Sequence, residues 1–130
     1  MNCKNTKKLI KSILNEIVKF NSSKIPNLHS QIKRLGIREI KKTGVGLYVD
    51  FKHNSYKKDK IKLINKSCCL SSELSLYIEG LNYSVNYELN ISNGKIDFLE
   101  IVTNGENWDG CIPNYRFIKE GIKRYRRYRG

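Results

Sequence analysis

The stretch Tyr87–Ile101 decides the fold and reads Tyr-Glu-Leu-Asn-Ile-Ser-Asn-Gly-Lys-Ile-Asp-Phe-Leu-Glu-Ile. Two runs with alternating apolar residues flank Asn93-Gly94, a pair that supplies the two positive-φ residues of a type I′ turn. We therefore expect residues 83–102 to form an antiparallel hairpin. Its second run, residues 95–102, alternates imperfectly. That strand is therefore expected to be either buried on both faces or bulged.

Further strands are expected before this hairpin in the sequence. Residues 45–51 and 74–78 alternate between apolar and polar side chains, as half-buried strands do. Residues 60–65 look like a short returning strand.

A final helix is expected after the strands, because Pro113 suits the first turn of a helix. The residues expected on one face of that helix are Ile118, Ile122 and Tyr125.

The front of the chain has helical rather than strand periodicity. Residues 6–20 carry one wide apolar stripe at a spacing near 3.6 residues, which predicts an amphipathic helix. The residues expected to be buried by that stripe are Leu9, Ile13 and Ile17. A second helix is expected to begin at Pro26 and to stop at Gly36.

These elements predict an α+β fold, in which N-terminal helices pack on an antiparallel meander sheet and a C-terminal helix follows. A chain of 130 residues is expected to form a single domain, residues 1–130. The sequence shows no export signal and no apolar run long enough for a bilayer, so we expect a cytoplasmic protein. Its richness in Asn, Ile and Lys, with no Ala, indicates an AT-rich bacterial or phage genome.

Charge is unevenly distributed along the sequence. The net charge is +13, yet residues 71–110 hold one basic and seven acidic residues. Strand alternation places several of these carboxylates on the side away from the apolar residues, where they could dock a basic protein. An ordinary solvent-exposed face is the alternative interpretation. The candidate contact residues are Glu73, Tyr77, Glu79 and Glu88 on the strands, with Glu106, Trp108 and Asp109 in the loop 103–111.

Catalytic and metal-binding patterns are weak in this sequence. No phosphate-binding loop or zinc-type cysteine spacing is present, and neither His29 nor His53 has a local dyad partner. Glu100, Glu106 and Asp109 could serve as acid, base or cation ligands, although a solvated loop explains them as well. We therefore expect no catalytic residue, no metal and no cofactor.

The hairpin at Tyr87–Ile101, preceded by N-terminal helices, resembles that of the immunity proteins of polymorphic toxin and contact-dependent growth inhibition systems. The resemblance implies a small, cytosolic, non-enzymatic α+β protein that binds and blocks a cognate toxin, such as a nuclease toxin domain. Many immunity proteins are acidic because their toxins are basic. In this basic chain, the acidic segment 71–110 is the contact surface that the resemblance would require.

A small nucleic-acid-binding protein is the alternative function. The basic residues gather toward both ends of the chain, and the segment after Arg116 mixes Arg with Tyr125 and Tyr128. Arginine and aromatic side chains together can hold phosphates and stack on bases. No recognised nucleic-acid-binding motif accompanies them.

Overall fold

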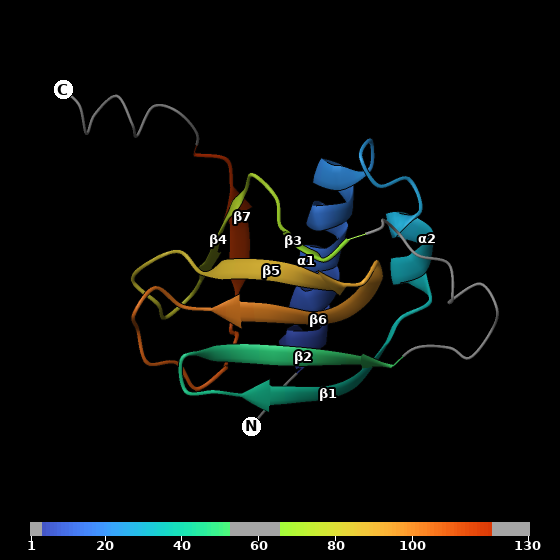
Figure 1. Ribbon diagram of the computed structural model, residues 1–130. Coiled ribbons are helices and arrows are strands. Elements are labelled where there is room, and N and C mark those ends of the chain that lie inside the picture. The colour runs from blue at the N-terminus through green and yellow to red at the C-terminus, as the bar shows by residue number, and fades with distance from the viewer. Residues whose placement is uncertain (1–3, 53–65, 121–130) are drawn as a thin grey trace.

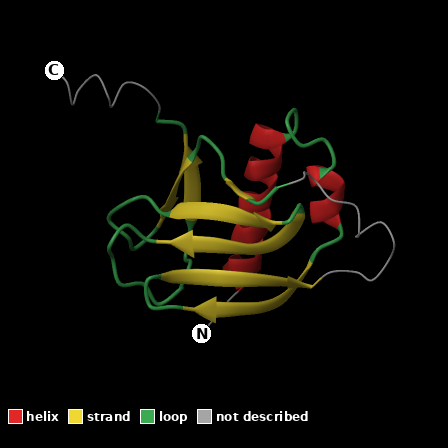
Figure 2. Ribbon diagram, in the orientation of Figure 1, coloured by secondary structure: helices red, strands yellow, loops and turns green. Residues whose placement is uncertain are grey.

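The computed structural model describes residues 4–52 and 66–120 (Figures 1 and 2). Their helices and strands are α1 (Lys4–Asn21), α2 (Leu28–Lys33), β1 (Gly36–Lys42), β2 (Gly46–Lys52), β3 (Cys68–Leu70), β4 (Ser75–Ile78), β5 (Asn86–Ser92), β6 (Lys95–Val102) and β7 (Tyr115–Ile118). One antiparallel sheet has the order β1-β2-β6-β5-β3, and β4 pairs with β7 in a second sheet. In Figure 1, α1 crosses behind the larger sheet, and α2 lies beside the right-hand end of that sheet.

The predicted hairpin is confirmed as β5 and β6. Asn93 and Gly94 form its turn with φ angles of 51° and 80°, as a type I′ turn requires. The pairing slips by one residue at Asp97, which is therefore the extra residue of a β-bulge. Because Glu100 is exposed, β6 is bulged and not buried on both faces.

The first helix packs its predicted stripe into the core. Leu9, Ile13 and Ile17 are fully buried, in one cluster with inward-facing strand residues such as Leu89 and Leu99. Helix α1 is therefore held by the burial of its apolar face, which stabilises a helix more than its intrinsic propensity does. In the part of the chain that the structure describes, neither helix has the length and apolar character of a membrane span.

The edge strand β1 was not predicted, and Gly36 begins it instead of stopping a helix. Its partly buried apolar residues are Ile37 and Ile40, which are three positions apart. A bulge at Arg38 causes this spacing, because it adds one residue between the two inward positions. The bulge therefore hides the period of two by which a strand is recognised. The second helix forms as α2 but is shorter than expected, because it begins at Leu28 instead of Pro26 and ends at Lys33.

The segment after Pro113 corrects the expected final helix. Residues 115–118 form β7, which pairs along its whole length with β4. Their aromatic and β-branched side chains favour an extended conformation, and β4 offers them a free edge. Ile122 and Tyr125, the other residues assigned to that helix, lie outside the described residues.

The strand order corrects the expected meander. Strand β2 pairs with β6, which lies about fifty residues further along the chain. These two neighbouring strands are therefore not consecutive in the sequence, whereas a meander requires that they are. The predicted strand at 74–78 forms as β4, but it belongs to the smaller sheet. The expected strand at 60–65 lies outside the described residues.

Two side chains of α1 bind the chain around β7. The Asn5 amide donates to the carbonyl oxygens of Ile112 at 2.9 Å and Pro113 at 3.0 Å. The hydroxyl groups of Ser12 and Tyr115 lie 2.7 Å apart. These contacts join residues 103 to 108 positions apart in the sequence, so the smaller sheet is fixed against the first helix.

Candidate protein-binding surface

The larger sheet has one buried face and one open face. Inward residues such as Val49 and Leu99 are fully buried, and the helices cover only that side (Figure 2). The residues that alternate with them point to the open side. We call the centre of this open side the acidic sheet face, and its residues are Tyr48, Asp50, Glu88, Asn90, Phe98 and Glu100.

Two glutamates stand directly opposite each other on this face. Glu88 of β5 and Glu100 of β6 are partners in the antiparallel ladder, and both are exposed. No hydrogen bond or ion pair from the described residues reaches either carboxylate. Like charges directly opposite in a sheet are destabilising. Among the described residues, this repulsion therefore has no counter-charge.

An aromatic pair lies beside the two glutamates. The rings of Tyr48 and Phe98 are stacked, with their centroids 4.6 Å apart and an angle of 22° between their planes. Both side chains are half-buried on the open side of the sheet. Tyr48 is also the ladder partner of Glu100. The face thus combines flat apolar surface with carboxylates, which together suit a cationic side chain.

Two ionisable side chains on or beside this face, Tyr48 and Cys69, have raised pKa values. The pKa of Tyr48 is raised, first by loss of solvation and then by the nearby carboxylates Asp97, Asp50 and Glu100. The pKa of Cys69, on the neighbouring strand β3, is raised first by loss of solvation and then by Glu88. Both pKa values rise chiefly because loss of solvation disfavours the anionic form, and the neighbouring negative charges add to that effect.

Asp50 differs from the two glutamates because it has a cationic partner. The Arg38 guanidinium donates to Asp50 Oδ2 through Nε at 2.9 Å and through a second nitrogen. Arg38 reaches this carboxylate from the bulge of β1. The unbalanced charge on the acidic sheet face therefore belongs to Glu88 and Glu100.

Two of the predicted contact residues, Glu73 and Tyr77, already contact side chains of residues 116–120. Glu73 forms an ion pair with Lys119 at 3.5 Å. The Tyr77 hydroxyl donates to the Glu120 carboxylate, and the Arg116 guanidinium lies 5.9 Å from the centre of the Tyr77 ring. These side chains hold β4 and β7 together.

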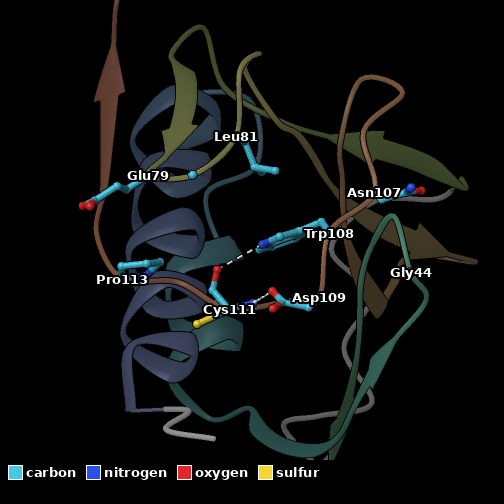
Figure 3. Close-up of a pocket in the computed structure, with 9 residues that line it drawn as sticks. Gly44, Glu79, Leu81, Asn107, Trp108, Asp109, Cys111 and Pro113 are labelled. Carbon is cyan, nitrogen blue, oxygen red and sulfur yellow. Dashed lines mark hydrogen bonds between the residues drawn. The ribbon is translucent and has the colours of Figure 1, made fainter.

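Three other predicted contact residues line a hollow of about 550 Å³, namely Glu79, Trp108 and Asp109 (Figure 3). Trp108 is only 7% exposed, and its indole nitrogen donates to the Cys111 carbonyl at 3.0 Å. Trp108 therefore covers the edge of the core and does not stand exposed as an anchor for a partner. Asp109 accepts a hydrogen bond from the Cys111 backbone at 2.9 Å.

Glu106, the remaining predicted contact residue, holds a turn. Its carboxylate accepts the backbone N–H groups of Asn82 at 2.8 Å and Tyr83 at 3.0 Å. Glu100, Glu106 and Asp109, which are close in sequence, thus have three separate environments. The structure does not combine them into one acid–base or cation site.

The expectation that Glu73, Glu79 and Glu88 share one face is wrong in part. Glu73 and Glu88 line a common hollow of about 430 Å³, together with Glu100. Glu79 follows β4 and lines the separate hollow beside Trp108. The difference arises because β4 leaves the larger sheet, so alternation on β4 does not continue the alternation on β5.

Histidine chemistry has little support among the described residues. His29 lines a hollow with Ser12 and Glu16, a combination that resembles a nucleophile, base and acid. However, the Ser12 hydroxyl is bonded to Tyr115, and Glu16 pairs with Lys19 at 3.7 Å. His53 lies outside the described residues. Within residues 4–52 and 66–120, no group of His, Cys, Asp and Glu is arranged to hold a metal ion.

Sequence reasoning missed Glu100 as a contact residue, along with Tyr48 and Phe98. An unbulged hairpin closed at Asn93-Gly94 would place Leu99 opposite Glu88. The bulge at Asp97 moves Glu100 into that position. The imperfect alternation of residues 95–102 was the available signal.

Comparisons with protein-family models, curated proteins and solved structures gave no match for this chain.

Proposed function

We propose that this chain is a bacterial immunity protein that binds a basic toxin and covers its active site with the acidic sheet face. The observation that carries the proposal is the pair of exposed, directly opposed glutamates, Glu88 and Glu100, which no other described residue neutralises. A basic partner would act as the missing counter-charge. The function needs no catalytic residue, cofactor or metal, and it would be exercised in the cytoplasm.

The chemistry of the face favours an arginine or lysine from the partner. A cation placed between Glu88 and Glu100 would remove their repulsion and gain two charge-assisted contacts. The Tyr48–Phe98 pair offers a surface on which a guanidinium plane can stack. In a nuclease toxin, the carboxylates would occupy the place of the substrate phosphates. Such charges mainly accelerate association and fix orientation.

The test is protection of bacterial cells from the toxin domain encoded beside this chain, together with the rate of complex formation. Glu100→Lys should slow association about tenfold or more at low salt and reduce protection. Glu79→Lys makes the same charge change away from the face and serves as the matched control. If Glu79→Lys impairs binding and Glu100→Lys does not, the hollow beside Trp108 is the contact surface and the proposal for the sheet face fails.

Nucleic-acid binding remains the second candidate, because Lys7, Lys8 and Lys11 form an exposed row on α1. Binding through phosphates requires the logarithm of affinity to fall by roughly 0.9 per phosphate neutralised for each tenfold rise in salt. Removal of residues 124–130 should reduce that slope. If the affinity for duplex DNA changes neither with salt concentration nor on this deletion, the mechanism is excluded.

A further inference from the structure

A groove of about 620 Å³ lies between α1, α2 and the first two strands, and we call it the helix groove. Its floor is apolar and combines buried with half-buried side chains. The floor residues are Ile10, Leu14, Ile32, Leu35, Ile37 and Phe51. Apart from the lysines at its rim, Asn15 is the only polar residue among the described residues that line it. A volume of this size is typical of sites that accept a ligand or an anchoring side chain.

Lysines stand on both walls of the helix groove. Lys7 and Lys11 lie one turn apart on α1, and Lys33 lies on α2. All three are exposed, and no hydrogen bond or ion pair from the described residues reaches their ammonium groups. Among the described residues that line the groove, none is Asp or Glu. In the part of the chain that the structure describes, the groove is therefore apolar at its floor and lined by lysines at its rim.

We infer that the helix groove binds an amphipathic helix of a partner protein, with an apolar stripe flanked by Asp and Glu. Leucine-type side chains on the stripe would pack against the floor, and the burial of apolar surface on both sides would favour binding. Carboxylates on both flanks would meet lysines on both walls. The four-residue spacing of Lys7 and Lys11 covers ~6 Å of helix, which matches carboxylates at the same spacing on a helix lying alongside.

The floor favours a helix over other acidic partners. It offers no hydrogen-bonding side chain, and a helix satisfies its own backbone groups. Nucleic-acid phosphates would meet the lysines but would leave the apolar floor uncovered. The inference is independent of the acidic sheet face, which lies on the opposite side of the sheet and has the opposite charge.

The probe is a dye-labelled synthetic helix of ~14 residues with leucines on one stripe and glutamates on both flanks. Its binding is followed by fluorescence anisotropy. Two matched peptides replace either the leucines with serine or the glutamates with lysine. The parent peptide should bind about tenfold or more tightly than each of them. Equal binding of the serine peptide would overturn the inference, because the floor would then contribute nothing.

Protein variants locate the binding. Lys11→Glu and Lys33→Glu should each weaken the parent peptide about tenfold. Lys95→Glu makes the same charge change in the exposed hairpin, outside the groove, and should leave affinity within about twofold. Equal effects of Lys11→Glu and Lys95→Glu would overturn the inference. The inference would also be overturned if duplex DNA binds more tightly than the peptide and Lys11→Glu weakens that binding. The rim lysines would then be a site for nucleic-acid phosphates.

Discussion

Replacing Glu100 with glutamine should stabilise the free protein, because it removes the repulsion across the β5–β6 ladder. Directly opposed Cα atoms in such a ladder are about 4.5–5.5 Å apart. Two unit charges about 5 Å apart in water repel by about 0.8 kcal/mol. Exposure and salt screening reduce this energy, so we expect Glu100→Gln to raise the free energy of unfolding by about 0.3–0.8 kcal/mol. The melting temperature should rise by about 1–3 °C.

The assay is urea unfolding at low ionic strength and again in about 1 M NaCl, where the Debye length falls to about 3 Å. The stability gain should largely disappear in high salt. Glu79→Gln is the matched control, because it also removes one exposed carboxylate and gives the chain the same net charge. If Glu100→Gln is no more stable than Glu79→Gln at low salt, the two opposed glutamates do not repel measurably and the reasoning about the acidic sheet face is wrong.

The core, the hairpin turn and a thiol provide three further predictions. Ile13→Ala should lower the free energy of unfolding by about 2–5 kcal/mol in urea titrations, because Ile13 is fully buried; an unchanged midpoint would contradict the assigned core. Gly94→Ala should cost about 1 kcal/mol or more by the same measurement, because Gly94 has a φ of 80°; a neutral effect would show that the turn tolerates a Cβ atom. The Cys69 thiol should alkylate more slowly at pH 8 than the same cysteine in an unfolded peptide, because its raised pKa lowers the thiolate fraction; peptide mass spectrometry measures this rate, and faster alkylation would contradict the direction of the shift.

Local chemistry allowed part of the fold to be predicted. The Asn93-Gly94 turn and the stripe of α1 are specified by neighbouring residues, and both are confirmed. The bulges at Arg38 and Asp97 are visible in the sequence only as broken alternation. The bulge at Arg38 concealed a whole strand, and the bulge at Asp97 placed Glu100 instead of Leu99 opposite Glu88.

The pairing of distant segments was the part that sequence reasoning could not supply. The sequence around residues 115–118 predicts a helix when it is considered alone, but these residues form a strand because they pair with β4. In the same way, Glu79 and Glu88 were assigned to one face because their strands follow each other in sequence. That assignment assumed one sheet, whereas β4 and β5 belong to different sheets. Which strand joins which sheet depends on tertiary packing.

The hydrogen bonds from Asn5 to Ile112 and Pro113 have a consequence for synthesis of the chain. A ribosome makes α1 first, yet the carbonyl groups that anchor its first turn are made more than 100 residues later. The same delay applies to β4, whose partner β7 is among the last described segments to emerge. Such non-local contacts form slowly, because a long loop must close before they are gained. Until these later segments emerge, nascent α1 lacks their contacts, and chaperones that bind apolar helical stripes have that interval in which to act.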